Sequence, residues 1–253
     1  MKKFSVLTYD IGGYEIIHEI PKEAMNPETE YIYVTDNPDA KSDTWTIVYD
    51  NELEGSTFDR CYQIRFSPFK YVNTDLVMRI DGSMPVMSDI TPIMDAFVNG
   101  GYDAAVMIHP WRSTILPEYQ VWCSVRNYPV QQAEKCLEFI MRQLYYNPES
   151  YKGLYQGNFV IQRNDCFNNA WNLTTYDVLK HLATAPDTIE RLDQTISSVI
   201  LNMMYSYKKI MPVDASILNG KYFKWCRHGT DDAFSVEQII EPYLFNQKVE
   251  TFK

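Results

Sequence analysis

Five short apolar runs in the first half of the chain each end in polar or turn-forming residues. The runs cover residues 3–9, 31–35, 45–49, 75–80 and 103–108. Apolar runs of this length, when they are bounded by turn residues such as Gly12-Gly13 and Asp81-Gly82, are typical of buried strands. Short strands that end in polar loops favour an open α/β sheet, in which ligands bind beyond the carboxyl ends of the strands.

Four further segments, residues 59–69, 88–99, 129–146 and 187–204, have patterns that predict helices. The pattern is clearest in 129–146, where Pro129 suits a first helical turn and apolar residues recur with helical spacing. No repeat, low-complexity segment or linker divides the chain. The sequence therefore predicts a single α/β domain over residues 1–253, an open mixed sheet flanked by helices.

Composition narrows the functional classes. A net charge of −10 repels nucleic-acid phosphates, so we expect no nucleic-acid partner. The five cysteines are widely spaced and include no CxxC motif, which is typical of reduced cytosolic thiols. We find no signal-like N-terminus and no apolar run of 18 residues. We expect no integral membrane segment and a cytoplasmic location, either free or peripheral at the inner face of the membrane.

Two polar segments have the chemistry of a metal site. Asp81 follows the run 75–80 and is followed by Gly82 and Ser83, and a carboxylate at a strand end is a suitable ligand for Mg²⁺ or Mn²⁺. His228, followed by Gly229, is a candidate ligand from a distant part of the chain. Alone, however, an Asp-Gly pair is most often a turn, and a single histidine is most often structural.

Charged residues elsewhere suggest a phosphate site and a catalytic carboxylate. Arg60, Arg65 and Lys70 form a basic cluster, and guanidinium groups bind phosphates in a bidentate manner. Asp193 and Gln194 lie in a predicted helix whose inward face should be apolar, so a carboxylate there needs a partner or a function. Solvated surface charges paired with neighbours would explain both features equally simply. A further polar segment, His109-Pro110-Trp111-Arg112, follows the fifth apolar run.

The order of several motifs along the chain resembles a known family. The motifs are LTYDIGGYE (7–15), YVTDNP (33–38), SDTW (42–45), RCYQIRFSPFKYV (60–72), RIDGSMPV (79–86), HPWR (109–112), GLYQGNFVIQR (153–163) and LDQ (192–194). This order is similar to that of the bacterial capsular-polysaccharide-type glycosyltransferases, which are related to the plant mucilage and pollen-tube glycosyltransferase-like proteins. The resemblance covers roughly residues 4–230.

The resemblance implies a GT-A-type fold with a Rossmann-like nucleotide-binding half, a UDP-sugar donor and a Mn²⁺ or Mg²⁺ ion. The family's Asp-x-Asp or Asp-x-Asn pattern corresponds here to Asp81-Gly82-Ser83, where a neutral Ser hydroxyl replaces the second carboxylate or amide. His228-Gly229 is similar to the C-terminal metal-binding histidine of glycogenin-like transferases. Residues 1–110 would then bind the nucleotide sugar, and residues 111–253 would complete the acceptor side.

These expectations assign a role to each candidate residue. Thr8, Tyr9 and Asp36 would contact the nucleotide, with Arg60, Arg65 and Lys70 around its diphosphate. The metal ligands would be Asp81, Ser83 and His228. Asp193 would be the general base of an inverting reaction, whereas in a retaining reaction Asp193 or Gln194 would orient the donor.

The predicted reaction moves a hexosyl group to a saccharide or glycolipid acceptor in surface polysaccharide synthesis. Two other functions remain open. A sugar-1-phosphate nucleotidyltransferase would also use an α/β sheet and a metal, but its phosphate loop usually carries basic residues, whereas residues 10–14 contain none. A non-catalytic sugar-binding module would explain the 14% aromatic content but would leave Asp81 and the basic cluster without a role.

Overall fold

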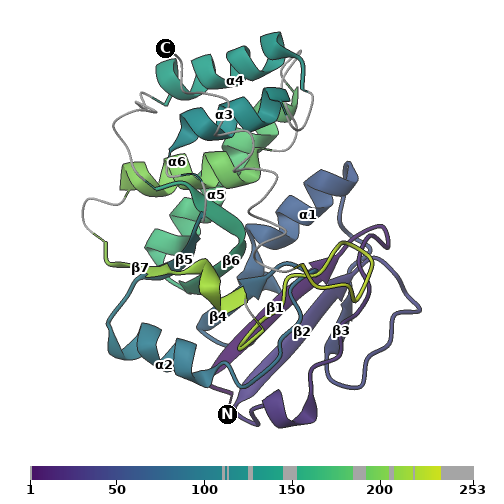
Figure 1. Cartoon of the computed structure of the whole chain (residues 1–253). Coiled ribbons are helices and arrows are strands. Elements are labelled where there is room, and N and C mark those ends of the chain that lie inside the picture. Colours follow the sequence, from purple (N-terminus) through teal and green to yellow (C-terminus); the bar gives the residue numbers. More distant parts are fainter. Residues whose placement is uncertain are drawn as a thin grey trace.

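The chain forms one seven-stranded mixed sheet with helices on both faces (Figure 1). The computed structural model describes residues 2–109, 112, 114–124, 128–144, 153–184, 192–204, 208–218 and 220–234. The strands are β1 (Phe4–Asp10), β2 (Thr29–Thr35), β3 (Thr46–Tyr49), β4 (Leu76–Ile80), β5 (Ala104–Ile108), β6 (Tyr155–Arg163) and β7 (Ile210–Val213). The helices are α1 (Thr57–Arg65), α2 (Thr91–Asn99), α3 (Ile115–Ser124), α4 (Val130–Arg142), α5 (Cys166–Thr184) and α6 (Asp193–Met204). Short 3₁₀ turns are η1 (Lys22–Ala24), η2 (Pro68–Lys70) and η4 (Ala215–Leu218).

The strand order is β3-β2-β1-β4-β6-β5-β7, and only β6 runs antiparallel to its neighbours. All five strands predicted from apolar runs are present, and the predicted open mixed α/β sheet is confirmed. Because β1 to β4 are parallel, their carboxyl ends lie along one edge of the sheet. This edge is where open α/β sheets bind ligands.

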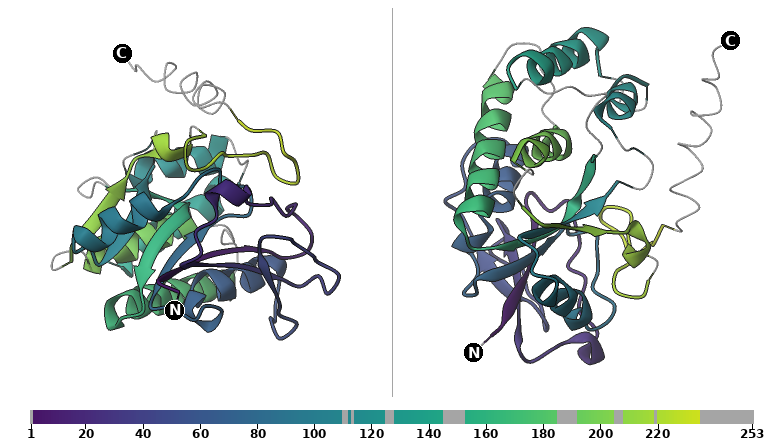
Figure 2. Two further views of the ribbon diagram at one scale, coloured as in Figure 1. Left: turned by 90° about the horizontal axis from the view of Figure 1, so that it is seen from below. Right: turned by 90° about the vertical axis from the view of Figure 1, so that its left-hand side faces the viewer.

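Two apolar layers cover the sheet. On one face, strand residues such as Met78 and Phe159 pack against α2 through Met94 and Phe97. On the other face, the strands pack against α1, α5 and α6, for example through Val160 and Ile196 (Figure 2). Helices α3 and α4 extend this second layer away from β1 to β3 (Figure 1). Among the described residues, no helix is long and apolar enough to span a membrane.

Three of the four predicted helices, α1, α2 and α4, are present with shifted ends, and the fourth begins later than expected. The sequence predicts a helix from residue 187, but Leu192 is not helical and α6 begins at Asp193. The Leu192 carbonyl accepts the first hydrogen bond of the helix, from Ile196 N at 2.8 Å, so Leu192 is the N-cap. Asp193 is therefore not within the predicted helix but at the positive N-terminus of α6. Residues 185–191 lie outside the described residues, as do 145–146 of the helix predicted at 129–146.

Candidate active site

An aspartate stands at the carboxyl end of each of four neighbouring parallel strands. Asp10 is the last residue of β1, and Asp36, Asp50 and Asp81 directly follow β2, β3 and β4. The register places these ends side by side, with Asp10 opposite Thr35 and Leu7 opposite Arg79. One edge of the sheet therefore carries a row of four carboxylates, and each of them has bonding partners.

Carboxylates also organise the loop after β1. Asp10 Oδ1 accepts hydrogen bonds from Tyr14 N and Glu15 N, both at 2.9 Å. Asp36 accepts Gly12 N at 2.9 Å and pairs with Arg60 Nη1 at 2.6 Å. Gly12 has a φ of +81°, a conformation that glycine adopts without strain. Three backbone N–H groups of this loop are thus used by aspartates.

Arg65, at the end of α1, connects the two halves of the chain. Its Nε donates to the Tyr9 hydroxyl at 2.7 Å, and its Nη2 pairs with Asp81 Oδ1 at 2.8 Å. Its Nη1 pairs with Asp193 Oδ2 on α6. Burial alone would lower the pKa of Arg65, but the neighbouring Tyr9 and Asp81 raise it, so the guanidinium is charged. All three nitrogens of Arg65 are occupied, and the side chain joins a strand-end carboxylate to a helix N-terminus.

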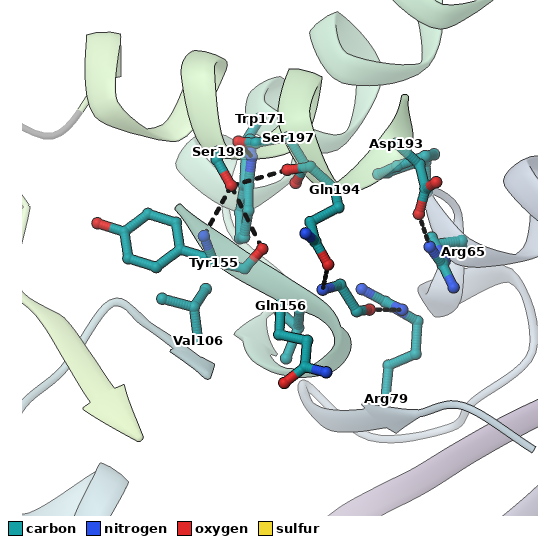
Figure 3. Close-up of a pocket in the computed structure, with 13 residues that line it drawn as sticks. Arg65, Arg79, Val106, Tyr155, Gln156, Trp171, Asp193, Gln194, Ser197 and Ser198 are labelled. Atoms are coloured by element: carbon teal, nitrogen blue, oxygen red, sulfur yellow. Dashed lines mark hydrogen bonds and ion pairs between the residues drawn. The ribbon is translucent and has the colours of Figure 1, made fainter. Parts of the chain in front are cut away.

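The second half of the chain contributes the start of β6 and the start of α6. In Figure 3 the Arg65 and Asp193 side chains point toward each other. Gln194 Oε1 accepts Gly157 N at 3.5 Å. Gly157 O accepts Arg79 Nη1 at 3.1 Å, and Asn158 O accepts Asp81 N at 3.0 Å. The end of β4 is therefore tied to β6 by both backbone and side-chain bonds.

A narrow recess lies between these elements. Its polar lining includes Arg65, Arg79, Gln156, Asp193 and Gln194. Its interior has room for about one water molecule. Several buried polar atoms of its lining residues, and of Asn158 next to Gly157 in β6, have no hydrogen-bond partner. They are Arg79 Nε, Gln156 Oε1, Asn158 Nδ2, Asn158 Oδ1 and Gln194 Nε2.

The three predicted metal ligands do not form a ready metal site. Asp81 Oδ1 is engaged by Arg65, and Ser83 is buried. His228 Nδ1 contacts Glu15, whose other carboxylate oxygen accepts Gly229 N at 3.0 Å. The described residues contain no group of three or more His, Cys, Asp or Glu side chains that is arranged to hold a metal ion. The donor set as folded does not fit a metal ion, because Asp81 Oδ1 and His228 Nδ1 already bind protein partners and no third carboxylate, histidine or cysteine completes the group among the described residues.

The C-terminal segment that carries His228 nevertheless reaches the site (Figure 1). Cys226 N donates to Ser83 O at 2.9 Å, and the Tyr14 and His228 rings lie 4.8 Å apart. Gly82 allows the end of β4 to lie close to β1 and the loop after it, because a Cβ at residue 82 would lie 3.0 Å from Glu15 Cγ and 3.2 Å from Tyr9 O. The structure therefore brings His228 to the loop after β1, with Glu15 as its partner.

The remaining predicted site residues lie in several places. Thr8 is buried, and Tyr9 is also buried, with a pKa that burial raises to about 12. Because successive strand residues point to opposite faces, the Thr8 and Tyr9 side chains lie on opposite faces of the sheet. Lys70 pairs with Asp50 at 2.7 Å, at the end of β3. Arg60 pairs with Asp36, and Arg65 pairs with Asp81 and Asp193, so the residues of the predicted basic cluster bind different carboxylates.

The His109-Pro110-Trp111-Arg112 segment is only partly described. His109 and Arg112 are buried and contact each other, and Arg112 Nε pairs with Glu118 Oε2 on α3 at 2.7 Å. Pro110 and Trp111 lie outside the described residues. This segment forms a buried ion network beyond the end of β5.

Sequence reasoning missed Asp10, Glu15, Arg79 and Asn158 as residues of the site. Asp10 and Asp50 repeat the strand-then-aspartate pattern of Asp36 and Asp81, so the pattern was available in the sequence. Arg79 lies two residues before Asp81, and the two-residue period of a strand places their side chains on one face. No pattern signalled Asn158, because its position depends on the pairing of β6 with β4.

Comparison with known proteins gives distant structural neighbours. No protein-family model and no curated protein matches the chain. The apo form of mouse xyloside xylosyltransferase 1 is similar with a TM-score of 0.46 and 10% identity, over 85% of this chain and 86% of that one. The glycosyltransferase GlyE of Streptococcus pneumoniae TIGR4 is similar with a TM-score of 0.41 and 14% identity, over 87% of this chain and 47% of that one. Similarity at this level assigns no activity to this chain, and the resemblance to the capsular-polysaccharide family stays a prediction.

Proposed function

We propose that the chain is a GT-A-type glycosyltransferase that moves a hexosyl group from a nucleotide diphosphate sugar, with UDP as the expected nucleotide. The observation that carries this proposal is the cluster of Asp81, Arg65 and Asp193 at the ligand-binding edge of the sheet. It joins a strand-end carboxylate of the first half to a helix N-terminal carboxylate of the second half. A transferase needs these two halves to meet, because donor and acceptor must be held against each other.

In this proposal the chain's own groups have distinct roles. The nucleotide lies across the carboxyl ends of β1 and β2, beside the loop that Asp10 and Asp36 organise. Asp193 faces the transferred sugar, where it is the general base if the reaction inverts and orients the donor if it retains. Gln194 places a buried, unpaired amide nitrogen at the recess, which suits a sugar hydroxyl or phosphate oxygen. The acceptor is a saccharide or glycolipid of surface polysaccharide synthesis.

A divalent ion is not part of these steps. When bound, such an ion would stabilise the charge of the departing diphosphate as a Lewis acid. Mg²⁺ and similar ions often use only one or two carboxylates together with substrate phosphates, and Asp81 is the carboxylate in position to do so. As folded, however, Asp81 is bound to Arg65. The predicted Mn²⁺ or Mg²⁺ ion therefore stays a prediction.

The alternative functions have less support. A nucleotidyltransferase needs free backbone N–H groups after its first strand to bind a triphosphate. Here Gly12, Tyr14 and Glu15 direct their N–H groups to aspartates. A non-catalytic sugar-binding module would not require the half-buried carboxylate cluster around Arg65.

One experiment separates the three functions. Purified protein is incubated with UDP-sugars, with and without Mn²⁺, and release of UDP is measured with and without saccharide acceptors. Nucleoside triphosphate plus sugar-1-phosphate is assayed in parallel for pyrophosphate. We expect UDP release that Asp193→Asn removes. Pyrophosphate release would favour the nucleotidyltransferase, and sugar binding without turnover of any donor would favour the module.

A further inference from the structure

Arg79 is a buried cation without a carboxylate partner. It lies in β4, is 4% exposed, and makes no ion pair among the described residues. Its Nη1 donates to Gly157 O at 3.1 Å, while its Nε is buried and has no hydrogen-bond partner. The Tyr9 side chain is a further hydrogen-bond partner of Arg79. A guanidinium group has five N–H donors, so part of its bonding capacity, including Nε, is unused.

The neighbouring charges explain why Arg79 stays unpaired. Asp81 and Asp193 are the carboxylates of this cluster, and both bind Arg65. Burial and the adjacent charge of Arg65 together lower the pKa of Arg79 to about 10, so the group is still protonated at neutral pH. A buried charge without a partner destabilises a fold, and a bound anion would offset this cost.

The surroundings of Arg79 suit a small anionic group. The recess that Arg79 lines also contains Gln194, whose Nε2 is an unpaired donor, and the N-terminus of the twelve-residue helix α6. The Asp193 carboxylate also lines it, but its charge is balanced by Arg65. Helix N-termini attract negative charge. The recess has room for about one water molecule, which matches a single phosphoryl oxygen rather than a sugar ring.

We propose that Arg79 binds a phosphoryl oxygen of the donor diphosphate and supplies the positive charge that this leaving group needs, so that donor binding does not depend on a divalent ion. This inference rests on the function proposed above. It agrees with the contacts of the expected metal ligands, since Asp81 is bound to Arg65 and His228 contacts Glu15.

The test compares uridine, UMP and UDP by calorimetry in excess chelator and then in Mn²⁺. Wild-type protein in chelator should bind UDP about tenfold or more tightly than uridine, the scale of one hydrogen bond to a charged group. Arg79→Met should reduce this preference to about threefold or less while uridine affinity is unchanged. Arg79→Lys, which keeps the charge but loses the fork of donors, should retain part of the preference.

Arg163→Met is the matched control. Arg163 is also a strand arginine that donates to a backbone carbonyl, Tyr102 O at 3.1 Å, but it lies at the opposite end of β6. It should leave the preference for UDP intact. In addition, apo Arg79→Met should melt at or above the temperature of the wild type, because it removes an unpaired buried charge.

Several outcomes would overturn the inference. An equal preference for UDP over uridine in wild type and Arg79→Met would show that Arg79 does not bind the diphosphate. UDP binding by the wild type only with Mn²⁺ would show the same. Both results would leave the proposed function in place. An Arg79→Met protein that fails to fold, together with an Arg79→Lys protein that folds and keeps the full wild-type preference for UDP, would make the arginine structural. If the wild type binds no nucleotide under either condition, the proposed function falls together with the inference.

Discussion

The ends of β1 to β3 and the junction of β4, β6 and α6 differ in how completely their polar groups are bonded. Asp10, Asp36 and Asp50 each accept hydrogen bonds from backbone N–H groups or cations. Near them, Thr8 Oγ1 and Arg60 Nε are buried without a partner. At the junction, by contrast, Arg79, Asn158 and Gln194 have buried polar atoms without partners. Buried polar groups in native proteins are normally hydrogen-bonded, so each exception needs an explanation.

This difference separates a scaffold from a binding surface. The aspartates of β1 to β3 fix loops whose shape is set before any ligand arrives. The junction keeps donors and acceptors unsatisfied, and such preorganised groups can bind a ligand without further rearrangement. Mutations at the junction should therefore change turnover most, whereas mutations at the ends of β1 to β3 should change stability with little effect on turnover.

The largest effect is expected for Asp193→Asn, which keeps the shape of the side chain and removes its charge. Turnover should fall by about 10²-fold or more, the scale of a lost acid–base group, while UDP affinity stays within about threefold. Steady-state kinetics and calorimetry measure the two quantities. Asp177→Asn, an exposed aspartate on α5, is the control and should change neither. Weaker UDP binding with normal turnover at saturation would place Asp193 in the nucleotide half instead.

Asp81→Ala tests the junction from the strand side. The side chain is 28% exposed and bound to the largely buried Arg65, so its loss should lower the free energy of unfolding by about 2 kcal/mol and abolish turnover. Urea denaturation and a donor-hydrolysis assay measure both. A variant with wild-type stability would show that Asp81 and Arg65 are not paired in solution. Near-normal turnover would remove Asp81 from the site.

The sequence predicted the scaffold better than the junction, and the reason is physical. Strands β1 to β5 are largely apolar runs, so the local sequence alone predicts that they are buried. Strand β6 was missed because Gln156, Gly157 and Asn158 interrupt its apolar pattern, and β7 was missed because it is short and contains Pro212. Helix α5 was missed because it buries polar residues, namely Asn168, Asn172 and Thr175, on the face that an amphipathic pattern requires to be apolar.

In the candidate site, too, some features could be predicted from the sequence and others only from the structure. The positions of Asp36 and Asp81 at strand ends follow from the apolar runs that precede them. The bonds of Arg65 to Asp81 and Asp193 join residues 16 and 128 positions apart, and no spacing in the sequence encodes them. The unpaired state of Arg79 is a property of the packed sheet, so only the structure reveals it.

Asp36→Asn should have a smaller effect that separates scaffold from binding surface. Asp36 accepts Gly12 N and pairs with Arg60, and loss of its charge should lower the free energy of unfolding by about 1 kcal/mol. Asp39→Asn, at an exposed position in the same turn, should remain within about 0.5 kcal/mol of wild type. Both are measured by denaturant titration. A tenfold loss of turnover at saturating donor in Asp36→Asn would contradict a purely organising role.

The smallest effect is a pH dependence from Asp50. Burial alone would raise its pKa, but hydrogen bonds from Lys70 and Tyr71 hold it below its ordinary value. A depressed pKa in the folded state contributes stability above the unfolded value of about 3.9, and this stability is lost as pH falls through the folded pKa. Asp50→Asn should therefore be less stable than wild type at pH 7, and the difference should shrink below about pH 4.

Asp10 provides the opposite case within the same row of carboxylates. Burial raises its pKa despite two backbone N–H bonds, so its protonated form favours the folded state at low pH. This contribution is present below the unfolded pKa and is lost as pH rises through the folded pKa. The stability of wild type relative to Asp10→Asn should therefore decrease with rising pH, whereas relative to Asp50→Asn it should increase. Thermal melts of wild type, Asp10→Asn and Asp50→Asn between pH 3 and 7 measure both trends. If the two variants show the same trend, the difference in burial and bonding between Asp10 and Asp50 is contradicted.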